Sequence, residues 1–177
     1  MQSILTKDFD ELLNSELDLE LFRNKTFFIT GATGLIGSLL TRFLLYADKQ
    51  IGLNLRILAL IRNQEKAQRL YADYLPTPLK FVVAELGHGN LQLTEKVDYI
   101  IHAAAVTRSK QMVTDPVETI HTALWGTDEV LRAAVESQAA AMVYLSSMEV
   151  YGQPATTGQT AETDLGYVDL NNVRSSY

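Results

Sequence analysis

The sequence predicts an α/β fold, a doubly wound parallel sheet of about five strands that are joined by helices. Short apolar runs without polar alternation recur along the chain, as is typical of parallel strands buried on both faces. Segments with helical spacing separate these runs, and this alternation favours a parallel sheet covered on both faces. We expect the strands at Thr26–Thr30, Leu55–Ile61, Leu79–Ala84, Val97–His102 and Met142–Ser146.

The first 22 residues are expected to form an amphipathic helix. Asp8 followed by Glu11 resembles a capping box. The apolar positions with helical spacing are Phe9, Leu12, Leu13 and Leu17. We therefore separate an N-terminal helical extension, residues 1–24, from a larger domain, residues 25–177. The apolar face of the extension is expected to pack either on the layers of the sheet or on a partner subunit.

The remaining helices are predicted from apolar spacing and from end signals. One helix follows the first strand, and a second is expected at Gln64–Tyr71. Asp115 and Pro116 supply an N-cap and an N1 proline for a long third helix. The apolar positions of that helix are Val117, Ile120, Leu124, Leu131 and Val135. After Gly152 the chain is polar and irregular.

Composition limits the classes of function. The 177 residues carry 15 Lys+Arg against 21 Asp+Glu, a formal net charge of −6, which disfavours nucleic acid and anionic membranes as partners. The chain has no cysteine, and its three histidines lack metal-ligand spacing, so we expect no metal site. No signal peptide and no apolar stretch of about 20 residues is present, so we expect a soluble, cytoplasmic protein.

A glycine-rich turn links the first strand to the helix that follows it. Gly31 permits a tight turn, Gly34 allows the backbone to approach a diphosphate, and Gly37 lets the helix pack closely on the strand. The unpaired amides at the start of a helix, together with the helix dipole, favour an anion. A turn without a ligand is the alternative.

The segment TGATGLIG, Thr30 to Gly37, resembles the cofactor fingerprint of the extended short-chain dehydrogenases/reductases, the NAD-dependent epimerase/dehydratase family of sugar-nucleotide enzymes. The resemblance runs from about Lys25 to the last residue and implies a Rossmann-type, NAD(P)-binding domain with an incomplete sheet. It also implies a nucleotide sugar as substrate. The cofactor-binding residues implied in the turn are Gly31, Thr33, Gly34, Leu35, Ile36 and Gly37.

Three further segments resemble the same family. His102-Ala103-Ala104-Ala105 resembles its H-x-A-A segment, in which the three alanines leave room for the cofactor and His102 is a packed residue rather than a catalyst. Glu85-Leu86 stands where the family has Asp-Leu beside the adenine. Gly126-Thr127 also matches, but Ala123 replaces an asparagine that helps to order the family's framework and a proton-relay water.

The end of the second strand bears on the choice of cofactor. An acidic residue there would bind the ribose diol of NAD, but this chain has Arg62 and Asn63. A guanidinium accepts a 2′-phosphate, and we expect no negative neighbour to neutralise Arg62 before Glu65. We therefore favour NADP over NAD. A solvated strand-end arginine is the alternative.

The segment Ser146 to Gly152 resembles the family's S-[ST]-x-x-V-Y-G. The resemblance implies that Ser147 is catalytic and hydrogen-bonds the reacting substrate oxygen; a capping serine that lies at a strand end is the alternative. The family's dehydratases carry Asp-Glu next, whereas this chain has Met148-Glu149. Dehydration is therefore disfavoured, and epimerisation, decarboxylation and carbonyl reduction stay open.

Tyr177 resembles the tyrosine of the family's Y-x-x-x-K motif, which moves a proton at the substrate and contacts the cofactor. The printed sequence ends at this tyrosine, so we expect the chain to turn over little or nothing without the lysine that stabilises the phenolate. The open edge of the fifth strand favours a homodimer or aggregation through that edge, unless the segment from Gln153 onward covers it. The functional alternatives are a cofactor-sensing regulator without catalysis and a structural or interaction module.

Overall fold

The computed structural model describes residues 4–74, 78–155 and 158–171. Five parallel strands form one sheet in the order β3-β2-β1-β4-β5. The strands are β1 Thr26–Thr30, β2 Arg56–Ile61, β3 Leu79–Val83, β4 Tyr99–His102 and β5 Ala141–Tyr144. The predicted doubly wound α/β sheet is confirmed. Each end of a predicted strand lies within two residues of the end of an observed strand.

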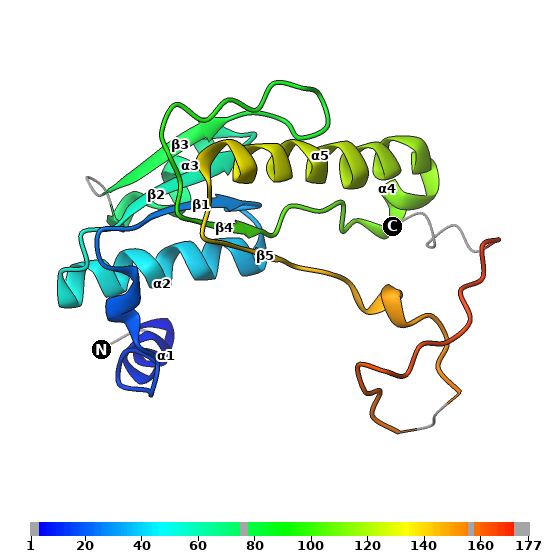
Figure 1. The fold of residues 1–177 in the computed structure, drawn as a ribbon, viewed down its shortest axis with the longest axis horizontal. Helices are drawn as coiled ribbons and strands as arrows, with labels where there is room; N and C mark the ends of the chain where they lie inside the picture. Colours follow the sequence, from blue (N-terminus) through cyan, green and yellow to red (C-terminus); the bar gives the residue numbers. More distant parts are fainter. Residues whose placement is uncertain (1–3, 75–77, 156–157, 172–177) are drawn as a thin grey trace.

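Helices cover both faces of the sheet (Figure 1). They are α1 Ile4–Leu13, α2 Leu35–Ile51, α3 Gln64–Leu70, α4 Ser109–Thr114 and α5 Pro116–Ser137, with short 3-10 helices η1 Leu19–Phe22, η2 Ala72–Tyr74 and η3 Met148–Tyr151. Alternate side chains of β1 feed two cores, because successive residues of a strand point to opposite faces. Phe27 and Ile29 join the core under α2 and α3, whereas Phe28 joins Val130 of α5 on the other face.

The N-terminal extension packs on the helical layer. Phe9 of α1 is 4% exposed, and its ring centroid lies 5.6 Å from those of Phe43 and Tyr46 on α2. The Tyr46 hydroxyl donates to Asp10 at 2.5 Å, a hydrogen bond that raises the pKa of Tyr46. The helix α1 therefore packs on α2, and its contact with the sheet is indirect, through that helix.

The predicted capping box of the first helix was wrong. The helix begins at Ile4, so Asp8 lies inside it, and the helix ends at Leu13 instead of running through residue 22. Residues 19–22 form η1, which Asp18 caps by accepting from the Glu20 amide. Burial of Phe9 against α2 sets the register of α1, and the local signal of two acidic residues did not outweigh it.

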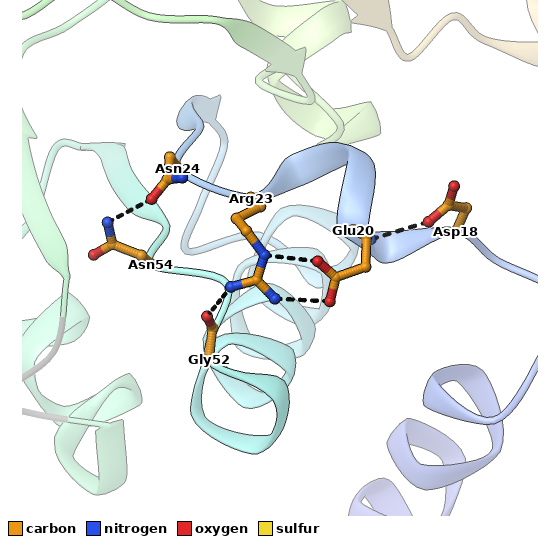
Figure 2. A network of polar contacts seen from close by, with 6 residues as sticks. All are labelled: Asp18, Glu20, Arg23, Asn24, Gly52 and Asn54. Atoms are coloured by element: carbon orange, nitrogen blue, oxygen red, sulfur yellow. Dashed lines mark hydrogen bonds and ion pairs between the residues drawn. The ribbon is translucent and has the colours of Figure 1, made fainter.

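A polar network ties η1 to the end of α2 at the amino edge of the sheet (Figure 2). The Arg23 guanidinium binds both carboxylate oxygens of Glu20, at 2.6 and 2.7 Å, and donates to the carbonyl of Gly52 at 2.6 Å. The bond to Arg23 keeps the pKa of Glu20 below its ordinary value. Gly52 ends α2 in the left-handed conformation, with φ +64°. The network thus joins the extension to the helix that begins at the glycine-rich turn.

Helix α5 begins at the predicted Pro116, and its predicted apolar stripe does not face the sheet. The buried residues of α5 are Thr119, Gly126, Val130, Ala133 and Ser137. The five apolar residues that predicted the helix are all exposed: Val117, Ile120, Leu124, Leu131 and Val135. At 100° per residue these five lie roughly opposite the buried set, so α5 presents apolar side chains on both sides. In the described part of the chain, no helix is long and apolar enough to cross a bilayer.

Replacing Phe9 with alanine should lower the free energy of unfolding by about 3 kcal/mol, because the ring is buried between two aromatic side chains of α2. Leu12, 41% exposed on the same helix, is the matched control, and Leu12→Ala should change stability by less than about 0.5 kcal/mol. Urea denaturation measures both. Equal losses in the two variants would contradict the packing of α1.

Candidate functional site

The glycine-rich turn between β1 and α2 is packed so closely that side chains have no room at two positions. Gly31 has φ +66°, and a Cβ there would lie 2.6 Å from the carbonyl oxygen of Ala103, which follows β4. A Cβ on Gly37 would overlap the backbone carbonyl of Gly31. The Gly34 amide donates to the same carbonyl at 2.8 Å. Glycine at 31 and 37 is thus required by the contact of backbone with backbone.

The start of α2 is open to solvent. The helix begins at Leu35, so the amides of Leu35, Ile36 and Gly37 have no acceptor within the helix. Leu35 is 80% exposed and Ile36 is also exposed, although both are apolar. These amides and the positive end of a 17-residue helix suit a bound phosphate or diphosphate.

Lys66 of α3 and Tyr71, the residue that caps the end of α3, hold the turn from the side, and the sequence analysis did not find either. The Tyr71 hydroxyl donates to the carbonyl of Ala32 at 2.5 Å, and Tyr71 is fully buried, which raises its pKa. Lys66 donates from Nζ to the carbonyl of Thr33 at 2.9 Å. Both bonds cross more than 30 residues, so no local spacing could have indicated them.

The predicted site residues follow the carboxyl ends of the five strands, which in a parallel sheet lie along one edge. Chain order reverses between β1 and β4, and ligands of such sheets bind at this crevice. The predicted positions gathered along this edge are Gly31, Thr33, Gly34, Leu35, Ile36 and Gly37 after β1, Arg62 and Asn63 after β2, Glu85 and Leu86 after β3, Ala103, Ala104 and Ala105 after β4, and Ser147 after β5. Tyr177 lies outside the described residues.

Arg62 has an acidic neighbour that the sequence analysis missed. Its Nη1 lies 3.4 Å from Oε1 of Glu85, and both side chains are largely exposed. The expectation that Arg62 meets no carboxylate before Glu65 was therefore wrong, because parallel pairing of β2 with β3 brings the two strand ends together. Glu85 consequently sits beside the guanidinium at the rim of the crevice.

Two other predicted residues are committed to the fold. The side chain of Asn63 caps α3 by accepting from the Lys66 amide at 2.8 Å. Leu86 is buried in the core, and it lies so close to α5 that a Cβ on Gly126 would be 2.9 Å from the Cβ of Leu86. Any contact of Leu86 with a ligand would therefore come from its backbone.

A cavity of about 460 Å³ lies between the ends of β4 and β5 and helix α5. It is lined by Ala104 and Ala105, by hydroxyl side chains of α5 and by residues after β5 that include Ser147 and Glu149. The Ser147 oxygen accepts from the Glu149 amide at 3.3 Å and caps η3, so the capping role weighed for this serine is present. Capping uses the oxygen as an acceptor and leaves the hydroxyl proton for another partner.

His102 lies at the end of β4 between the turn and this cavity. Its ring is 3% exposed, and burial lowers its pKa to about 4. Nδ1 lies 2.6 Å from the hydroxyl of Thr30, and Nε2 lies 3.3 Å from that of Thr127. The expectation of a packed strand-end histidine agrees with this burial.

A larger cavity, of about 720 Å³, is formed by residues 89–96 and the second half of α5. None of the predicted site residues lines it. The crevice at the carboxyl edge, with the turn on one side and Ser147 on the other, is therefore the candidate site.

Residues 27–177 match the family described as the NAD dependent epimerase/dehydratase family. The chain belongs to this family. Among curated relatives, the UDP-glucose 4-epimerase of Rickettsia bellii is 32% identical over 131 residues, and that of Rickettsia canadensis is 31% identical over the same length. Each match covers 72% of this chain and 38% of the relative, so the chain spans well under half the length of the relatives it matches.

Solved structures of the family share the fold. A UDP-Glc/GlcNAc 4-epimerase from Campylobacter jejuni superposes with a TM-score of 0.68 at 22% identity, over 86% of this chain and 46% of that protein. A UDP-N-acetylglucosamine 4-epimerase from Methanobrevibacter ruminantium gives 0.67 at 17% identity, over 87% and 47%. The Rossmann-type sheet expected from the resemblance is thereby confirmed, and residues 1–26 lie outside the family match.

Replacing Gly37 with alanine should weaken dinucleotide binding by at least about tenfold, because the new methyl group meets backbone atoms that no side-chain rotation can move. Gly158→Ala is the control, since nothing lies within 4 Å of a Cβ there. Isothermal titration calorimetry with NAD and NADP measures both variants, and circular dichroism checks that they fold. A folded Gly37→Ala protein with unchanged affinity would contradict this account of the turn.

Proposed function

We propose that residues 25–177 are the NAD(P)-binding N-terminal part of an enzyme that acts on a nucleotide sugar, with residues 1–24 as an extension that braces α2. The observation that carries the proposal is the position of the exposed start of α2 at the switch point between β1 and β4, beside the cavity that contains Ser147. The relatives and solved structures named above are 4-epimerases of nucleotide sugars, and their names support this substrate class.

The residues present fit a dinucleotide. The turn offers a cradle that a Cβ at Gly31 or Gly37 would fill, and the free amides of Leu35 and Ile36 are donors for the diphosphate. Ala104 and Ala105 would leave space for the ring at the reacting end. When bound, the nicotinamide accepts or returns a hydride, and this is the only chemistry that the cofactor supplies.

Ser147 would orient and polarise the reacting hydroxyl or carbonyl of the substrate. Its oxygen is held by the Glu149 amide, so the hydroxyl proton can be directed into the cavity, where a substrate oxygen would accept it. Tyr177 is the proposed proton donor and acceptor by resemblance alone. Met148 stands where the dehydratases have an acid, and a thioether carries no proton, so we favour epimerisation over elimination of water.

The cofactor-sensing alternative has less support. The two curated relatives named above are enzymes by name. The residue proposed as catalytic lines a cavity that also contains Ala104, whose backbone lies beside Gly31 of the turn. Ala123, which replaces the family's asparagine, also lines that cavity, and its carbonyl accepts from the Thr127 hydroxyl at 2.6 Å. This hydrogen bond links Thr127 to position 123 of α5, where the family has an asparagine.

We also propose a preference for NADP over NAD. Arg62 and Lys66 bring two positive charges to the outer end of the turn, where the adenosine ribose would lie. Glu85 opposes this preference in part, because its carboxylate pairs with Arg62. An exposed ion pair is worth no more than about 1 kcal/mol, so a 2′-phosphate can compete with it for the guanidinium.

The test is calorimetric titration of the chain with both dinucleotides. At least one should bind, and NADP should bind more tightly; Arg62→Gln should then weaken NADP by about tenfold and NAD by less than about twofold. Arg69→Gln is the control, because Arg69 pairs with Glu65 on α3. Absence of binding by either dinucleotide would overturn the proposed function, whereas equal weakening of both would overturn only the NADP preference.

We propose a homodimer that forms through the outer face of α5. Its apolar side chains at Val117, Leu124 and Leu131 are exposed and spaced by seven residues, so they are symmetric about Leu124. A second copy running antiparallel would set Val117 against Leu131 and Leu124 against itself, and such self-complementarity is what a two-fold interface requires. Exposed apolar side chains of this kind are a common mark of an interface.

Replacing Leu124 with glutamate should convert the dimer to a monomer, because two carboxylates would meet at the two-fold axis. Val143→Glu is the comparison, since Val143 is exposed on β5, the edge strand that was first expected to mediate association. Light scattering coupled to gel filtration measures the mass of each. A monomeric wild-type chain, or a dimer broken only by Val143→Glu, would contradict an α5 interface.

A further inference from the structure

A buried chain of hydrogen bonds runs through His102 and joins three elements of the site. Thr30 ends β1 and is fully buried, His102 ends β4, and Thr127 lies on α5. The Thr30 hydroxyl lies 2.6 Å from Nδ1 of the ring, and the Thr127 hydroxyl lies 3.3 Å from Nε2. Each threonine hydroxyl also has a backbone partner, and these two partners indicate which group donates and which accepts in each hydrogen bond to the ring.

The direction on the α5 side follows from the one proton of Thr127. Its hydroxyl donates that proton to the carbonyl of Ala123 at 2.6 Å, since a carbonyl can only accept. The Thr127 oxygen is then an acceptor toward the ring, so Nε2 of His102 carries the hydrogen.

The direction on the β1 side follows in the same way. The Ala104 amide donates to the Thr30 oxygen at 3.1 Å, so the proton of Thr30 is left for the ring. Thr30 donates it to Nδ1 across 2.6 Å, and Nδ1 must be unprotonated to accept it. Thr30 therefore donates to Nδ1, and Nε2 donates to Thr127. Both bonds form together only when the histidine is neutral and carries its proton on Nε2.

The partners of this ring are parts of the proposed binding site. Ala104, held through Thr30, follows Ala103, whose carbonyl packs on Gly31 of the glycine-rich turn. On the other side, Ala123 and Thr127 line the cavity that contains Ser147. Tyr144, whose ring centroid lies 5.3 Å from that of His102, lines the same cavity.

We propose that His102 is a positioning residue, which as the neutral Nε2–H tautomer sets the wall of the substrate cavity relative to the cofactor-binding turn. A protonated ring would direct a second N–H at the Thr30 oxygen, and Thr30 would lose the acceptor of its own proton. The tautomer depends only on hydrogen bonds within the protein. Its effect on ligand binding rests on the proposed function.

The first test is nitrogen-15 NMR of the histidine rings. From about pH 8 to about pH 5, His102 should keep one protonated nitrogen, Nε2, and one unprotonated nitrogen, Nδ1. His88 and His121 are exposed and provide internal references in the same spectra, and His88→Gln and His121→Gln assign them. A ring protonated on Nδ1, or one that gains its second proton within that pH range, would overturn the proposal.

The second test separates positioning from mere packing. Thr127→Val removes the acceptor of Nε2–H at nearly constant volume, whereas Thr127→Ser keeps the hydroxyl. The valine variant should shift His102 toward a mixture of tautomers and weaken dinucleotide binding by about fivefold or more, and the serine variant should stay within about twofold of wild type on both readouts. A folded valine variant with the wild-type tautomer and affinity would overturn the proposal.

The two readouts also separate this proposal from the proposed function. If neither dinucleotide binds the wild-type protein, the proposed function fails. The nitrogen-15 spectra of His102 still show in that case whether the ring is the neutral Nε2–H tautomer that the hydrogen bonds require. Should Thr127→Val fail to fold, the ring spectra of the wild-type and Thr127→Ser proteins decide it in the same way.

Discussion

The contact of backbone with backbone around the glycine-rich turn is the constraint on which the candidate site depends. The carbonyl of Gly31 occupies the space that a side chain on Gly37 would need, and the carbonyl of Ala103 occupies the space beside Gly31. This approach brings the start of α2 against the end of β1, next to the end of β4. An exposed helix start therefore lies at the point where the order of strands reverses, and its amides are available to an anion.

Polar groups around this contact are held by partners distant in the chain. Lys66 of α3 and Tyr71, just after α3, bind carbonyls of the turn, and the Thr30–His102–Thr127 chain joins the turn to α5. Buried polar groups without partners are costly, so such a network favours one arrangement of the elements over others. Rigidity of this kind would suit the proposed function, in which two ligands lie within reacting distance of each other.

The order and type of the elements were predictable, because strands buried on both faces leave an unbroken apolar run and helices leave a period of 3.6 residues. What failed was the assignment of neighbours. The exposed stripe of α5 predicted a helix correctly, but periodicity does not reveal which face meets the sheet when both faces are apolar. The pairing of Arg62 with Glu85 spans 23 residues, and the capping box at Asp8 was overruled by the packing of Phe9.

The sequence by itself determined the alternation of strands and helices, the family, and the glycines at positions 31 and 37, where the backbone leaves no room for a side chain. These features are local, because each depends on residues that are close together in the sequence. The tertiary structure alone decided that His102 bridges two threonines, that Lys66 and Tyr71 hold the turn and that α1 packs on α2. Contacts of that kind join residues tens of positions apart, and only the folded sheet, which sets the strand ends side by side, brings them within hydrogen-bonding or van der Waals distance.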